Sequence, residues 1–227
     1  MKKSTLRLLA VLVACVLLAT LAPLYAANAA TDYSTIRVRL DSLSASSLTF
    51  KPVGNYYVQE NTQLELASGA TYTLSVSGAN VVLSGGSLGA VNLGSTANLI
   101  QAKASGENKG LQFNGKGDYY PGNFKLSVVS GKIQLINTVY FEDYITGVID
   151  KEVGNSFPTE AMKAAALSAR SYALQYMGSN RDYDVVNTTS NQVYGGYPYG
   201  SANCISVVEA TKGQVITYNG SIVDGVY

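Results

Sequence analysis

The 227-residue chain contains no histidine. Catalytic sites that activate a serine or a cysteine through an imidazole are therefore excluded, as are zinc sites with imidazole ligands. Carboxylates, tyrosines, lysines and arginines remain for the chemistry. We predict neither a cofactor nor a bound metal.

Cysteine and excess charge are also scarce. Of the two cysteines, Cys15 lies in an N-terminal segment that we expect to be removed, which would leave Cys204 without a partner for an intramolecular disulfide. Removal would delete three of the 16 basic residues and none of the 15 acidic ones, leaving a net charge of −2. Nothing in this balance indicates a nucleic-acid partner.

The N-terminal residues 1–29 are typical of a secretory signal peptide. Basic residues precede an apolar run over 8–22, and Ala27-Asn28-Ala29 supplies the small-x-small pattern of a cleavage site. The run falls short of the roughly 20 residues that span a bilayer. Two alternatives stay open: an uncut membrane anchor, and lipidation at Leu12-Val13-Ala14-Cys15. We expect an exported protein, secreted or associated with the cell wall, that meets a membrane only if this segment is uncut.

The pattern after the signal peptide predicts an α+β fold in two parts. Residues 30–137 alternate apolar and polar positions between glycine-bearing breaks, which favours antiparallel hairpins. Residues 138–227 begin with two helices. The first covers 141–153 and is ended by Gly154, and the second begins at Pro158 and ends before Gly178. The apolar stripe of the second helix is mostly alanine, and we expect it to receive Gly147 of the first. Its members are Met162, Ala165, Ala169, Ala173 and Tyr176.

Beyond Gly178 the chain returns to strands. Residues 213–218 and 221–227 predict a hairpin about Asn219-Gly220, and 207–211 a short helix. No repeat of 20 to 50 residues is present.

Several blocks of the second part, in order, closely resemble the stage II sporulation protein D and amidase-enhancer LytB family. They are 139–149, Glu152, 157–164, 169–174, Thr188-Thr189, 192–196 and 211–218. Residues 120–123 and 133–137 match more loosely.

The resemblance implies a peptidoglycan lytic transglycosylase, with a role in cell-wall remodelling or sporulation. Its substrate would be glycan strands whose stem peptides an N-acetylmuramoyl-L-alanine amidase has removed, and Glu152 would be the catalytic acid. Two alternatives remain open: a non-catalytic wall-binding module that stimulates an amidase, and a purely structural surface module.

The chain departs from the family pattern at three places. Ala165 stands where the family commonly has glutamine. Ser190-Asn191 stands where some members have a His-Cys pair linked to zinc, so the metal is not carried over. The family's domain normally continues past Tyr227 into a Ser-rich, Gly-Gly segment, so we expect the 138–227 core to be incomplete at its C-terminal end.

A single carboxylic acid can give a proton to the leaving sugar oxygen and later accept one, so Glu152 alone can serve both steps. To hold that proton near neutral pH it needs apolar or aromatic cover, for which Tyr144, Val148 and Phe157 lie near in sequence. The alternative is a solvated ion pair with Lys151 or Lys163.

Four further residues are candidate substrate contacts. Arg170 would bind the lactyl carboxylate of the sugar, Tyr172 and Tyr194 would stack on sugar faces, and Gln192 would donate to hydroxyl or N-acetyl groups. The tyrosines and Gln192 have structural alternatives as core or strand-capping residues. The alternative for Arg170 is an ion pair with Glu142 or Asp143.

Overall fold

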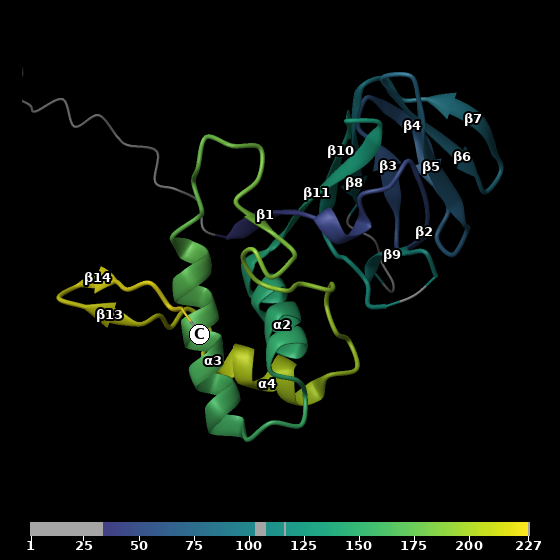
Figure 1. Ribbon diagram of the computed structural model, residues 1–227. Coiled ribbons are helices and arrows are strands. Elements are labelled where there is room, and N and C mark those ends of the chain that lie inside the picture. The colour runs from purple at the N-terminus through teal and green to yellow at the C-terminus, as the bar shows by residue number, and fades with distance from the viewer. Residues whose placement is uncertain (1–33, 103–107, 116, 227) are drawn as a thin grey trace, which may run out of the picture. The chain divides into compact units, whose positions relative to one another are not determined.

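The computed structural model describes residues 34–102, 108–115 and 117–226 (Figure 1). The predicted signal peptide lies outside these residues. Within them no helix is long and apolar enough to cross a membrane.

Two sheets form the β-rich half. The seven-stranded sheet has the order β12 (Val185–Val186), β1 (Thr35–Arg39), β11 (Lys132–Tyr140), β10 (Asn123–Val129), β8 (Thr96–Gln101), β3 (Tyr56–Val58), β4 (Asn61–Leu66). The five-stranded sheet has the order β7 (Leu88–Asn92), β6 (Asn80–Gly85), β5 (Tyr72–Ser77), β2 (Ser47–Val53), β9 (Gly110–Phe113). All neighbours are antiparallel except β1 and β12. A 3₁₀ turn, η1 (Asp41–Leu43), follows β1. The predicted α+β fold with antiparallel hairpins is confirmed.

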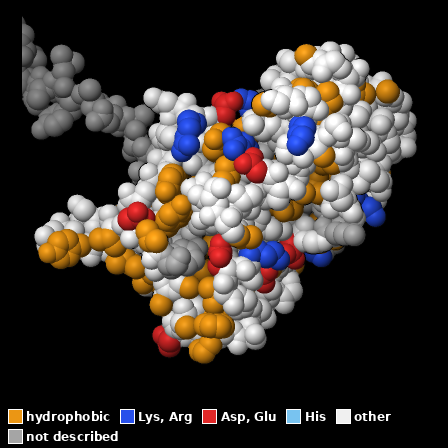
Figure 2. Space-filling model, viewed as in Figure 1, with side chains coloured by type: hydrophobic (Ala, Val, Ile, Leu, Met, Phe, Trp, Pro, Cys, Tyr) orange, Lys and Arg blue, Asp and Glu red, His pale blue; other side chains and the backbone are white. Residues whose placement is uncertain are grey.

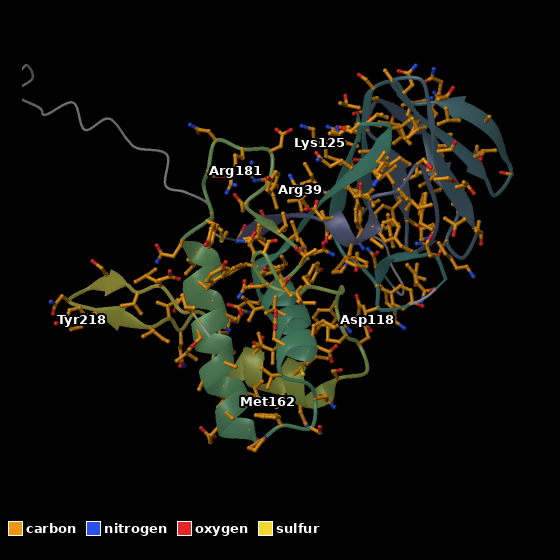
Figure 3. The ribbon with its side chains drawn as sticks, in the orientation of Figure 1. Arg39, Asp118, Lys125, Met162, Arg181 and Tyr218 are labelled. Carbon is orange, nitrogen blue, oxygen red and sulfur yellow. The ribbon has the colours of Figure 1, made fainter. Side chains whose placement is uncertain are left out.

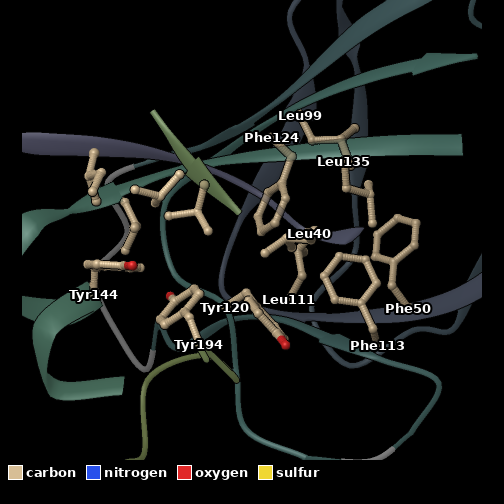
Figure 4. Close-up of a cluster of buried hydrophobic side chains, with 14 of the residues drawn as sticks. Leu40, Phe50, Leu99, Leu111, Phe113, Tyr120, Phe124, Leu135, Tyr144 and Tyr194 are labelled. Carbon is tan, nitrogen blue, oxygen red and sulfur yellow. The ribbon is translucent and has the colours of Figure 1, made fainter. Parts of the chain in front are cut away.

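Alternating apolar side chains build one core from both sheets. In β2 the buried residues are every second one, including Phe50, because successive strand side chains point to opposite faces. Phe113 of β9 packs edge-on against Phe124 of β10, with ring centroids 5.7 Å apart. Figure 4 follows this aromatic cluster from Phe50 to Tyr120, Tyr194 and Tyr144, which carry the core into the helical part.

Three helices make up the rest of the core. Helix α2 (Phe141–Glu152) follows β11 without a loop and buries its apolar residues at helical spacing. Helix α3 (Thr159–Leu174) begins one residue later than predicted, with Pro158 as its N-cap, and ends three residues before the predicted end. Helix α4 (Ala202–Ala210) begins five residues before the short helix that the sequence indicated. It buries Cys204, Val207 and Val208.

The role expected of Gly147 is corrected by its surroundings. A Cβ atom at this position would lie 2.3 Å from the carbonyl oxygen of Gly196 and 2.6 Å from the ring of Tyr194. Gly147 therefore admits the segment 194–196 rather than α3. On α3, Met162, Ala169 and Ala173 of the predicted stripe are fully buried, while Ala165 and Tyr176 are partly buried against the core and Ala166 is buried in addition.

The C-terminal hairpin forms where the sequence predicted it. Asn219 and Gly220 have φ angles of 49° and 79°, the two positive values that a type I′ turn requires. Its strands, β13 (Thr217–Tyr218) and β14 (Ser221–Ile222), are shorter than expected. Tyr218 is 72% exposed on this hairpin (Figure 3), and Figure 2 shows further hydrophobic side chains along it.

Substituting Gly147→Ala should destabilise the fold by about 2 kcal/mol, because the new methyl group meets backbone and a buried ring. Chemical denaturation measures the change. Gly89→Ala is the matched control, since a Cβ there meets nothing within 4 Å. Equal stability of the two variants would show that segment 194–196 does not pack on α2 as described.

Candidate catalytic cavity

The end of α2 positions Glu152. The helix stops here because Gly154 adopts a φ of +89°, a left-handed conformation typical of helix C-termini, and its N–H donates to the Ile149 carbonyl. Glu152 is the last helical residue, and its side chain is exposed. The carboxylate therefore stands on a rigid element at the surface.

The loop of residues 187–194 faces Glu152. Hydrogen bonds made by its amide side chains hold the loop against neighbouring elements. Asn187 accepts a hydrogen bond from the Ser42 N–H and donates to the Ser42 hydroxyl. The Gln192 amide oxygen accepts from the Tyr144 hydroxyl at 3.0 Å, and its nitrogen donates to the Ala169 carbonyl at 3.2 Å. The loop is thereby tied to η1, α2 and α3.

The third amide is that of Asn191. Its oxygen accepts from the Val186 N–H at 2.9 Å, and its nitrogen donates to the Tyr172 hydroxyl oxygen at 3.1 Å. Asn191 thus links β12 to α3 across the loop.

The loop meets the carboxylate directly. The Val193 N–H donates to Oε1 of Glu152 at 2.7 Å, the length of a charge-assisted hydrogen bond. The alternative ion pairs of Glu152 are not formed: Lys151 pairs with Asp118 and Asp150, and Lys163 pairs with Glu160.

A cavity of about 300 Å³ opens beside this contact. Its volume is at the lower end of the range for small-ligand sites, about 300 to 1,000 Å³. The lining residues are Glu152, Tyr172, Thr189, Ser190, Asn191, Gln192 and Val226. Three sequence-predicted site residues, Glu152, Tyr172 and Gln192, are thus brought together. Loop residues 189–191 and Val226 were not predicted as contacts.

Arg170 lies elsewhere, in the ion pair with Glu142 that the sequence left as its alternative. Its side chain is 1% exposed, and Nη2 lies 2.8 Å from Oε2 of Glu142. The remaining guanidinium donors reach backbone carbonyls, including that of Gln214 at 3.0 Å, while Oε1 of Glu142 also accepts from the Gly213 N–H. The pair lies in a separate hollow of about 670 Å³ with Phe141 among its apolar walls.

Tyr194 is also outside the cavity. It is 1% exposed, and its ring centroid lies 5.1 Å from that of Tyr144 and 5.6 Å from that of Tyr120. Burial raises its pKa well above the usual value. The ring is a core element that joins the helices to the sheets, and it presents no face to a sugar.

The expectation that apolar side chains cover Glu152 is also corrected by the structure. Val148 and Tyr144 lie one and two turns before Glu152 and are fully buried in the core, whereas Phe157 is 54% exposed. Glu152 itself is exposed. Helical spacing placed these residues near one another in sequence but could not show that the helix ends with its last carboxylate outside the core.

The residues at the family's His-Cys position do not fit a zinc ion. Ser190 and Asn191 supply neither thiolate nor imidazole, and both polar atoms of the Asn191 amide are used in the bonds to Val186 and Tyr172. Among the described residues, no three or more acidic, cysteine or histidine side chains are arranged so that they could hold a metal ion.

Comparisons with known proteins bear on this segment. A family model described as stage II sporulation protein matches residues 129–218. The amidase enhancer of Bacillus subtilis is 35% identical over 164 residues, which cover 71% of this chain and 22% of that protein. The stage II sporulation protein D of Bacillus subtilis is 28% identical over 108 residues, 40% of this chain and 32% of that protein. An uncharacterised protein of Brachyspira hyodysenteriae is 31% identical over 109 residues, 47% and 29% of the two chains.

The chain belongs to the stage II sporulation protein D and amidase-enhancer family. It spans less than a third of the length of each of these relatives. The stage II sporulation protein segment holds all of the cavity lining except Val226, together with the buried Glu142–Arg170 pair. Most of the β-rich half lies before it.

Breaking the Glu142–Arg170 pair should be costly. Arg170→Met leaves a buried carboxylate without its partner, so we expect a loss of about 3 kcal/mol in unfolding free energy. The double variant Arg170→Met, Glu142→Leu should lose much less than the sum of the two single changes. Strictly additive losses in denaturant titrations would contradict a direct interaction.

Asp143 should make stability depend on pH. Burial, opposed by Lys212 and assisted by Glu142, raises its pKa to about 6. A pKa raised on folding means that the stability contribution is present at acidic pH and is lost as pH rises toward and past about 6. Asp143→Asn should therefore stabilise the protein by about 1 kcal/mol at pH 7.5 and by almost nothing near pH 4.

Denaturation at several pH values tests this expectation. Asp182→Asn is the control, because Lys125 lowers the pKa of that exposed carboxyl instead, and it should gain no stability at high pH. A gain for Asp143→Asn that is constant with pH would refute the assignment.

Proposed function

We propose that this protein acts in the bacterial cell wall as a lytic transglycosylase, cleaving the glycan backbone of peptidoglycan with Glu152 as its acid and base. The observation that carries the proposal is the Val193–Glu152 contact at the edge of the cavity. Family membership gives the carboxylate its context, and the named relative, an amidase enhancer, suggests glycan strands from which an amidase has removed the peptides.

The carboxylate would act twice. The N–H of Val193 holds Oε1, so Oε2 carries the proton that passes to the glycosidic oxygen as the bond from that oxygen to C1 of the sugar breaks. The same oxygen then accepts the proton of the muramic acid 6-hydroxyl as that hydroxyl bonds to C1. The product is a 1,6-anhydro sugar, and no water is consumed.

The lining of the cavity suits this intramolecular reaction. Hydrolysis normally uses two carboxylates, one on each side of the scissile bond. Among the described residues that line the cavity, Glu152 is the only carboxylate. Tyr172 lies beside it as the proposed sugar contact, while Gln192, whose amide is bonded to Tyr144 and Ala169, holds the wall of the cavity.

Substituting Glu152→Gln should lower the release of 1,6-anhydro sugars from amidase-treated glycan by about 10³-fold, because the amide keeps the side-chain shape but cannot transfer the proton. Chromatography of the soluble products measures the rate. Glu160→Gln is the matched control, since Glu160 is exposed on the first turn of α3 and pairs only with Lys163 at 2.8 Å. Full activity in the Glu152 variant would reject the enzymatic proposal.

A non-catalytic module that binds the wall and stimulates an amidase is the second candidate. The observation in its favour is the name of the 35% identical relative, amidase enhancer. Under this function Glu152→Gln would leave both sacculus binding and amidase stimulation unchanged, while the wild-type protein alone would release no anhydro sugar.

A further inference from the structure

Asn191 has an amide orientation that its partners determine. The Val186 backbone N–H can only donate, so the atom 2.9 Å from it must be the amide oxygen of Asn191. The amide nitrogen then faces Tyr172, 3.1 Å from the hydroxyl oxygen. Because an amide nitrogen has no lone pair to offer, the Tyr172 oxygen must accept this hydrogen bond.

Tyr176 packs against Tyr172. The rings of Tyr172 and Tyr176 pack with centroids 4.9 Å apart. A side-chain hydrogen bond with Tyr172 raises the pKa of Tyr176. Because Asn191 donates to the Tyr172 oxygen, Tyr172 cannot give its own proton to residue 191, and the Tyr172 side chain lines the Glu152 cavity.

We propose that Asn191 is a positioning residue that makes the Tyr172 hydroxyl a one-way hydrogen-bond donor to an oxygen of the glycan bound beside Glu152. This inference rests on the proposed function of the cavity and adds to it a residue that acts through Tyr172. The bond that Asn191 makes to Val186 anchors the arrangement on β12, so the donor direction is set before substrate arrives.

Asn191→Asp separates this role from simple packing. An aspartate keeps the size of the side chain and still accepts from Val186, but its second oxygen accepts as well, so Tyr172 would turn its proton toward residue 191 and away from the sugar. Asn191→Asp and Tyr172→Phe should each lower kcat/KM for anhydro-sugar release about ten-fold. The double variant should be no slower than either single variant.

The double-mutant comparison also answers the objection that aspartate adds charge near Glu152. A charge effect on Glu152 is independent of the Tyr172 hydroxyl, so its loss would multiply with that of Tyr172→Phe. Multiplied losses, or an unchanged rate in Asn191→Asp, would overturn the proposal. Asn61→Asp, on the exposed face of β4, is the control and should keep the wild-type rate.

Measurements of oligosaccharide binding test the same proposal independently of catalysis. In a Glu152→Gln background, Asn191→Asp and Tyr172→Phe should each raise the Kd for a short N-acetylglucosamine–N-acetylmuramic acid oligosaccharide about ten-fold, again without a further loss in combination. If the wild-type protein binds this oligosaccharide without cleaving it, the proposed transglycosylase reaction is rejected. The Kd values of the variants then still test the roles of Asn191 and Tyr172. Absence of binding in every form would overturn both.

Discussion

The fastening of loop 187–194 by amide side chains is the constraint on which the cavity depends. The loop forms no regular helix or strand, and besides a few backbone hydrogen bonds its position depends on the bonds that Asn187, Asn191 and Gln192 make to η1, β12, α2 and α3. Each bond is modest in net free energy, about 1 kcal/mol. Together they present one N–H group, that of Val193, to the carboxylate of Glu152.

Behind the loop, the helical part is held together by two buried centres of different chemistry. The Glu142–Arg170 pair joins α2 to α3, and Arg170 also reaches backbone carbonyls at the end of α4 and beyond it. Tyr194 packs between Tyr144 of α2 and Tyr120 of the β-rich half. These residues hold the elements that bear the cavity, and neither Arg170 nor Tyr194 lines it. Local sequence patterns cannot separate such roles, because a buried arginine and a sugar-binding arginine can have the same neighbours along the chain.

Local signals predicted the boundaries of many elements. Gly154 and Pro158 bound the helices, Asn219-Gly220 makes the hairpin turn, and alternation reveals the strands, because each feature depends on the conformational preferences of a few adjacent residues. The parallel pairing of β1 with β12 joins residues about 147 positions apart, and no local pattern encodes it. The exposure of Glu152 depends on the turn at which α2 leaves the core. The Val193 contact is made by backbone, which carries no side-chain signal at all.

The central claim is that the glycosidic oxygen of a peptidoglycan strand binds at Glu152 while Val193 holds the carboxylate. The most direct test is a crystal structure of the Glu152→Gln variant with an N-acetylglucosamine–N-acetylmuramic acid oligosaccharide. The account predicts a glycosidic oxygen within about 3 Å of the residue-152 side chain, and Tyr172 in contact with the sugar. A sugar bound elsewhere, with the cavity beside residue 152 empty, would contradict it.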